Sequence, residues 1–295
     1  MFRQVSKADC LAVALILSAS FSSSWAVAQD VRQTAGARPI PMESAAPLSP
    51  ALESILLEWE KESASVTRMN GQFNRVVYDS VFNVAKCSTG SYAYESPDKG
   101  MMNFLPDNAA ASRHPGKVQR GDIEFTLQVD EAQRWVCDGE QILSIDPTNK
   151  EYNRVVIPPR FRGANISEGP LPFLFGMKAE KMKQRYVLEL GRLHDPANII
   201  HIVAYPKMPE EQREYRVAEV LLYPDTFFPR AIQLATSENR QTVYIFTTHE
   251  KMPSFTLFKT NPFKPSLLGY KILHDAEAPA PLDRESRKQD GIILR

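Results

Sequence analysis

The side chains that could perform catalysis do not fall into the spacings that catalysis requires. His249 is followed by a glutamate, but Pro253 stands where the second histidine of a metalloprotease motif would be needed. The chain has no Gly-x-Ser-x-Gly elbow, no Walker loop and no dinucleotide fingerprint. Asp138 and Asp146 are better explained as turn residues than as a glycosidase pair. We therefore predict a protein that is not an enzyme and that uses no metal ion or cofactor.

The first 28 residues have the composition of a secretory signal peptide. Arg3 and Lys7 precede a short apolar run, and residues 26–28 read Ala-Val-Ala, which is typical of a cleavage site. The apolar run is shorter than the roughly 20 residues that a membrane-spanning helix needs. We predict cleavage after Ala28, a periplasmic or secreted protein, and no transmembrane span.

Two cysteines, Cys87 and Cys137, remain after this cleavage. In an oxidising compartment an even pair is a candidate for a disulfide. The alternative is two small buried apolar side chains that never meet. The sequence leaves both possibilities open, and neither cysteine belongs to a CxxC motif that would indicate zinc or redox chemistry.

The overall composition is that of a globular protein with no electrostatic preference for nucleic acid. The 35 basic residues balance the 35 acidic ones, so the basic surface that nucleic acid binding requires is not expected. Residues 29–48 and 276–295 are polar and contain several prolines, which predicts a flexible linker and a flexible tail. The folded domain is expected to span residues 49–275.

Hydrophobic periodicity predicts one helix followed by many strands. Ser49 and Pro50 provide an N-cap and a first helical residue, and the apolar spacing that follows predicts an amphipathic helix ending near Met69. Asp138 and Gly139 lie between two apolar runs and predict a hairpin with a type I′ turn. A proline-rich stretch with alternating charge predicts two short helices between 168 and 190, and 107–118 is expected to be a loop. The predicted strands are Phe73–Tyr78, Ser91–Tyr94, Met101–Leu105, Ile123–Leu127, Trp135–Cys137, Glu140–Ile145, Tyr152–Ile157, Ile199–Tyr205, Tyr215–Tyr223, Pro229–Thr236 and Gln241–Thr248.

This order of elements predicts an α+β fold built on one large antiparallel sheet. Tyr244 and Phe246 point to one face of the sheet, while Val243 and Ile245 point to the other, so both faces carry apolar side chains. Curling the sheet around its helices would bury one face and leave an apolar hollow, as in half-barrels that hold hydrophobic ligands.

The sequence from Leu52 to Thr248 resembles the periplasmic lipoprotein carriers and their relatives with the LolA/LolB-like fold. The best markers are residues 137–147, which resemble the carriers' Asp-Gly hairpin, and residues 171–175, which resemble their proline-phenylalanine helix across the mouth. The chain is also similar to uncharacterised secreted proteins of planctomycetes. The stretch 98–104, where carriers have an arginine that pins the lid, contains none, and the segment 106–134 is longer than a plain hairpin connection.

The resemblance implies an open half-barrel with an N-terminal helix and short lid helices, whose cavity receives acyl chains. Pro172 and Gly176 bracket the apolar triplet of the expected lid. Arg154, Arg160 and Arg162 lie near the expected rim, either to meet anionic head groups or as a solvated border. The residues expected to line the cavity, each of which could also be an ordinary core residue, are Trp59, Phe104, Trp135, Ile142, Phe173, Phe175, Tyr244 and Phe246.

Two functions from different classes follow from these observations. The first is an exported carrier or binder of lipid or lipidated protein. The second is an envelope sensor or interaction module that uses the same fold to bind a protein partner. An interior filled by side chains such as Phe104 and Trp135 would favour the second function, and a continuous apolar tunnel would favour the first.

Overall fold

The computed structural model describes residues 48–112, 116–159, 162, 173, 178–191, 199–236, 239–253 and 260–277. The predicted signal peptide lies outside these residues, as do Arg160 and Phe175. The helices are α3 (Pro50–Ala64), α4 (Asn108–Ala111), α6 (Ala179–Arg185) and α7 (Pro209–Glu214). The strands are β1 (Arg68–Asp79), β2 (Val84–Glu95), β3 (Lys99–Pro106), β4 (Lys117–Arg120), β5 (Ile123–Val129), β6 (Gln133–Cys137), β7 (Gln141–Asp146), β8 (Glu151–Val156), β9 (Tyr186–Leu190), β10 (Ile200–Pro206), β11 (Val217–Leu222), β12 (Pro229–Ala235), β13 (Arg240–Met252) and β14 (Lys271–Glu277).

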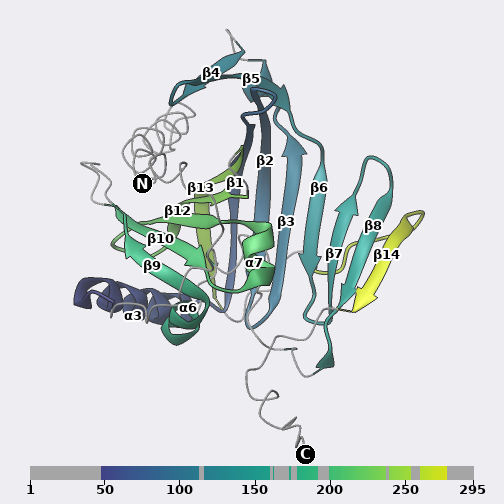
Figure 1. Ribbon diagram of the computed structural model, residues 1–295. Helices are drawn as coiled ribbons and strands as arrows, with labels where there is room; N and C mark the ends of the chain where they lie inside the picture. Colours follow the sequence, from purple (N-terminus) through teal and green to yellow (C-terminus); the bar gives the residue numbers. More distant parts are fainter. Residues whose placement is uncertain are drawn as a thin grey trace, which may run out of the picture.

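These strands form one large curled sheet, as the alternating pattern predicts (Figure 1). Its order is β14-β8-β7-β6-β3-β2-β1-β13-β12-β11-β10-β9, with β5 and β4 attached to β2 off this path. The neighbours are antiparallel except for β14 beside β8 and β5 beside β2, which are parallel. Since β14 and β9 stand at opposite ends of the order, the sheet is open. The predicted α+β fold, an open half-barrel with an N-terminal helix, is confirmed.

Helix α3 begins as predicted but ends earlier. The backbone N–H of Leu52 donates to the Ser49 hydroxyl over 3.2 Å, and Pro50 occupies the first turn. The helix ends at Ala64 rather than near Met69, because Ser65 takes the C-cap position and its N–H closes on carbonyls of the last turn. Met69 instead belongs to β1, and its side chain is buried.

The hairpin between β6 and β7 is present, but its turn differs from the predicted type I′. That turn needs positive φ at both central residues, whereas only Gly139 has it, with φ +92°. The Asp138 carboxylate accepts hydrogen bonds from the backbone N–H groups of Glu140 and Gln141, each over 2.9 Å. This side-chain cap holds the turn without the strained conformation of a type I′ aspartate.

The segment expected to be a plain loop after β3 contains α4 and β4. The hairpin of β4 and β5 covers part of the convex face of the sheet, where Phe125 packs edge-on against Tyr78 with ring centroids 5.1 Å apart. Arg120 at the end of β4 lies 4.4 Å above the Tyr78 ring and donates to the side-chain oxygen of Gln233. We call this hairpin the flap.

A second segment covers the convex face over β6 and β7. Residues 260–270, which we call the strap, place Phe263 among Ala93, Val136 and Leu143. The chain then forms β14, a strand that the sequence did not predict and that extends to Glu277, two residues beyond the expected end of the domain.

Cys87 and Cys137 do not form a disulfide, which is the second of the two possibilities that the sequence left open. Cys137 pairs with Gly100 across β6 and β3, and Gly100 pairs with Tyr94 across β3 and β2. Cys87 lies further along β2 by seven residues (94 − 87), which is about 23 Å of strand. A disulfide requires Cα atoms within about 7 Å of each other. Both cysteines are buried, as the alternative interpretation expected.

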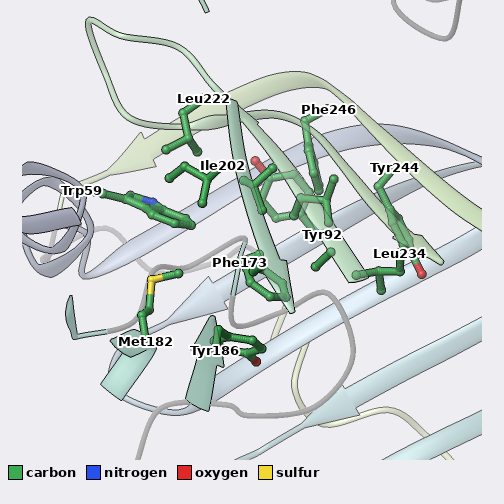
Figure 2. Packing of buried hydrophobic residues seen from close by; sticks show 14 of the residues in the cluster. Trp59, Tyr92, Phe173, Met182, Tyr186, Ile202, Leu222, Leu234, Tyr244 and Phe246 are labelled. Carbon is green, nitrogen blue, oxygen red and sulfur yellow. The ribbon is translucent and has the colours of Figure 1, made fainter. Parts of the chain in front are cut away.

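The main core occupies the concave face of the sheet (Figure 2). Alternate residues of the strands point into it, and α3 and α6 cover one end with Trp59 and Met182. Because strands from both halves of the order, such as β3 and β12, contribute to the same cluster, the curl of the sheet itself builds the core.

Gly71 in β1 allows the backbone of β13 and the Tyr92 ring to lie close against its own backbone. A Cβ atom added there would lie 2.1 Å from the carbonyl oxygen of Thr248 and 2.5 Å from the Tyr92 ring. The neighbouring backbone belongs to the central β1–β13 pair, so it cannot move without breaking the ladder. The position is also adjacent to a register shift between Gln72 and Phe73.

We expect Gly71→Ala to lower the free energy of unfolding by about 3 kcal/mol, the upper end of the usual cost of overpacking. Urea denaturation followed by circular dichroism measures this. The control is Gly269→Ala, where the added Cβ meets nothing within 4 Å and only the positive φ of 79° is penalised, at about 1 kcal/mol. Equal costs at the two positions would contradict the packing explanation.

His249 is a neutral histidine inside an aromatic group. Its ring stacks on Phe228 with centroids 5.0 Å apart, and its Nδ1 lies 2.6 Å from the Tyr92 hydroxyl. Burial lowers the pKa of His249 from 6.5 to about 4, because the charged imidazolium would lose its hydration. The unfolded chain therefore binds more protons than the folded chain between these two pH values.

Because the pKa of His249 is lower in the folded chain than in the unfolded chain, its contribution to stability is complete above about pH 6.5. It is lost progressively as the pH falls to about 4. We expect a loss on the order of 2 kcal/mol across this window, reduced from the full shift because the ring is partly exposed. Comparing urea unfolding of the parent with that of His249→Gln at several pH values isolates this contribution. The exposed His274 in β14 provides the control, and His274→Gln should keep the pH dependence of the parent.

Candidate functional site

A row of aromatic side chains runs across the concave face. The rings of Trp135 and Phe104 meet edge-on at 5.2 Å, and Phe104 meets Phe73 in the same way at 5.2 Å. Phe73 in turn lies 6.1 Å from Tyr244 and 6.3 Å from Phe246. Edge-to-face contacts of this kind add to the free energy gained from burial alone. The strands β6, β3, β1 and β13 each supply a ring at the inward-facing position of the pleat.

The structure brings the predicted lining residues that it describes into one cluster. Trp59, Phe104, Phe173, Tyr244 and Phe246 are buried there, and Trp135 and Ile142 are half-buried against it. For those on strands, the assignment to the concave face follows from strand alternation, which the sequence already displayed, whereas Trp59 reaches the cluster from α3.

The apolar cluster continues beyond the buried core onto β6, β7 and the end of β8. Trp135, Ile142 and Ile157 pack against the core but keep part of their surface exposed. Ile142 lies opposite Cys137 in the β6–β7 register, and Val155 lies opposite Ile142 in the β7–β8 register. These four half-exposed side chains, Trp135, Ile142, Val155 and Ile157, form what we call the apolar border.

Phe173 lies deep in the same cluster although its chain neighbours are not described. It is 1% exposed, its ring lies 5.4 Å from that of Tyr186 and it meets Tyr215 edge-on at 6.2 Å. The Tyr186 and Tyr215 hydroxyls form a hydrogen bond of 2.9 Å, which satisfies both in an apolar setting. Burial raises the pKa of Tyr186 to about 12, so the pair stays uncharged.

Helices α3 and α6 are joined mainly by polar contacts at their edges. The backbone N–H of Ala179 donates to Glu60 over 2.9 Å, and the Lys183 ammonium donates to Glu53 over 3.1 Å. Met182 of α6 is buried beneath them. Exposed ion pairs contribute about 1 kcal/mol or less, so α6 is held chiefly by buried Ala179 and Met182, by the Glu60 cap and by the partly buried Arg185–Glu211 pair.

A buried arginine on the concave face was missed by the sequence analysis. Arg75 lies with its guanidinium 4.0 Å above the Phe104 ring, and it donates to the Ser88 hydroxyl over 3.2 Å and to Asp130 over 2.7 Å. Both side chains of the Arg75–Asp130 ion pair are about nine-tenths buried, at 9% and 12% exposed. The signal was present, because the alternation of Phe73, Arg75 and Val77 places all three on the same face of β1.

The rim arginines do not form one group in the structure. Arg154 pairs with Asp275 of β14 over 2.9 Å, and its cross-strand partner is Leu143, a residue of the convex cluster. Arg162 donates to the carbonyl of Ile157 over 3.1 Å and lies 3.6 Å from Glu140. Of these two, Arg162 is therefore the one beside the apolar border.

The concave face is lined by apolar side chains, and its buried cation, Arg75, is paired with Asp130. Among the described residues, no group of histidine, cysteine, aspartate and glutamate side chains could hold a metal ion. Within the same part of the chain, no helix has the length and apolar character needed to cross a membrane.

The comparisons with known proteins give structural likeness without close sequence relatives. No family model matches the chain, and no curated protein matches it significantly. An uncharacterised conserved protein from Thermus thermophilus is 7% identical with a TM-score of 0.41, covering 76% of this chain and 99% of its own. LprF from Mycobacterium bovis is 10% identical with a TM-score of 0.35, covering 74% and 99%. A LolA superfamily protein from Nitrosomonas europaea is 8% identical with a TM-score of 0.31, covering 68% and 93%. At these identities the likeness concerns the fold alone.

Proposed function

We propose that the protein is an exported binder or carrier of acyl chains, with lipid or a lipidated protein as its ligand. The observation that supports this most directly is the apolar border, where the concave cluster reaches solvent through Trp135, Ile142 and Ile157. Each methylene buried on such a surface contributes about 0.8 kcal/mol, so one acyl chain laid along it would gain most of its affinity from burial. The signal peptide pattern of the sequence supports a location outside the cytoplasm.

The aromatic row limits the positions that a bound acyl chain could occupy. Phe104 has no exposed surface, and the Trp135 ring packs edge-on against it. The interior beside these two rings is therefore filled by side chains. An acyl chain would therefore lie along the border rather than in the interior around Phe104. Arg162, next to Ile157, is placed to meet an anionic group at the end of the chain.

The same filling favours a second candidate function, an envelope module that binds a protein partner. The rings of the row other than Trp135 are buried and packed on one another, so the concave cluster reaches solvent at the half-exposed apolar border, and such a border with a tryptophan is the type of patch that protein partners bury. The two functions predict different behaviour of a free fatty acid. An acyl-chain binder would bind it at the border, and a protein-binding module would not.

Replacing Ile142 by threonine tests the acyl-binding proposal while keeping a β-branched residue in the strand. We expect the affinity for a fluorescent fatty acid, measured by fluorescence titration, to fall about tenfold, because apolar contact area at the border is lost. The matched control is Ile123→Thr on the flap, a partly exposed isoleucine far from the border. Circular dichroism melting checks that both variants remain folded. Absence of any fatty acid binding by the parent, or equal losses in both variants, would reject the proposal in favour of the second candidate.

The cover formed by α3 and α6 should respond to an acyl ligand. Since α6 is only seven residues long and lies at the edge of the core, we expect its amide hydrogens to exchange faster than those of residues 241–248 in the empty protein and to slow when a fatty acid binds. Hydrogen exchange followed by mass spectrometry measures both segments. Unchanged exchange in α6 at a saturating fatty acid concentration would show that this helix is fixed core.

A further inference from the structure

A polar pocket of about 340 Å³ opens on the convex face, between the strap and the strands β2, β3 and β6. It is distinct from the apolar border, because its strand residues alternate with those of the concave row. Met101 and Asn103 line the pocket, whereas Met102 and Phe104 point to the opposite face. The lining residues are Ser91, Met101, Asn103, Arg134, Thr260, Asn261, Pro262, Lys264, Pro265 and Ser266.

The charge in this pocket is positive and has no acidic counterpart. Arg134 and Lys264 are its charged lining residues, and the lining contains no carboxylate. One N–H group of Arg134 donates to the carbonyl of Pro262 over 2.9 Å, while its Nε is buried without a hydrogen-bond partner in the described part of the chain. Burial also lowers the pKa of Arg134, because the guanidinium is partly stripped of water. A desolvated cation with an unused donor is costly unless an acceptor completes it.

The sequence of the strap and its flanks agrees with this charge. Residues 251–274 contain four lysines, Lys251, Lys259, Lys264 and Lys271, and no aspartate or glutamate. Lys264 lies in the pocket lining, and the segment carries no acidic residue of its own to offset that charge.

The pocket is formed without needing a ligand to fold it. Phe263 is 3% exposed and anchors the strap in the convex cluster. Asn261 shapes the turn, since its side-chain oxygen accepts from the N–H of Phe263 over 3.0 Å. Arg134 then ties the strap to β6 through Pro262. A site held in place in this way loses little conformational entropy on binding.

We propose that this pocket binds a phosphate group, carried by a small soluble molecule or by a lipid head. A guanidinium and an ammonium together match the charge of a phosphate, and the hydroxyl and amide side chains of Ser91, Asn103 and Ser266 supply further donors. The volume exceeds that of phosphate alone and leaves room for the group to which it is attached. This proposal does not depend on acyl binding at the border.

Isothermal titration calorimetry with inorganic phosphate tests the site in the mature chain at an ionic strength held constant with sodium chloride. We expect saturable binding with one site per chain. Lys264→Gln should weaken it about tenfold, the usual effect of losing one charge-assisted hydrogen bond. The matched control is Lys271→Gln, an exposed lysine of β14 outside the lining, which should bind as the parent does. Arg134→Gln should abolish binding. Because Arg134 also holds the strap and its loss could unfold it, Lys264→Gln at the exposed side of the pocket decides the test.

Sedimentation with phosphatidylcholine vesicles, with and without phosphatidic acid, distinguishes the two sources of phosphate. Binding of inorganic phosphate that depends on Lys264 identifies a soluble ligand. Binding only to vesicles that contain phosphatidic acid, again dependent on Lys264, identifies a lipid head group. No binding in either experiment, or equal effects of Lys264→Gln and Lys271→Gln, overturns the proposal. Lys264→Gln should bind a fluorescent fatty acid as the parent does, so failure of one site is separable from failure of the other.

Discussion

The constraint that governs this structure is a large sheet with apolar side chains on both of its faces. A sheet can bury one face by curling, and here strands as distant in the order as β3 and β12 meet on the concave side. Curling leaves the convex face exposed, so separate segments must cover it. The flap covers Tyr78 and its neighbours, and the strap covers Val136 and its neighbours. The two additions to the chain that look irregular in sequence therefore serve the same requirement, which is to remove apolar area from water.

The same burial determines how polar groups behave inside the curl. An unpaired polar group in an apolar interior costs several kcal/mol, so polar side chains there are expected to have partners close by. Arg75 has Asp130 and Ser88, Tyr186 has Tyr215, and His249 has the Tyr92 hydroxyl. These pairs join segments that are far apart in sequence, as with Arg75 and Asp130, which are 55 residues apart. They fix the register of the interior rather than supply reactive groups, since burial holds the tyrosines and the histidine in their neutral forms.

Strand alternation predicted most strands of the sheet and which of their side chains share a face, because its period is two. It missed β4, β9 and β14, and β9 lies where a short helix was expected. It could not predict the parallel pairs β14–β8 and β5–β2, since the choice of neighbouring strand depends on tertiary packing and not on the local pattern of either strand. Of the flap, β5 was predicted as the strand Ile123–Leu127, whereas β4 begins inside the segment 107–118 that was expected to be a loop. Arg75 was missed although its position between Phe73 and Val77 marked it as inward-facing, because its partner lies in a distant turn. The separation of Cys87 and Cys137 likewise required the strand order, which no local pattern contains.

The proposed ligand sites share one short strand. Trp135 belongs to the apolar border and Arg134 to the phosphate pocket, and as consecutive residues of β6 they point to opposite faces. A single lipid would have to pass around the open edge at β14, beyond β7 and β8, to reach both sites. This distance argues for two separate ligands. Any coupling between them would be transmitted by β6, which is hydrogen-bonded on both sides to β3 and β7 and therefore moves little. A ligand can change the affinity of the other site only through a structure that changes between the bound and free states, so a β6 that moves little leaves the two affinities nearly independent, and linkage makes this hold in both directions.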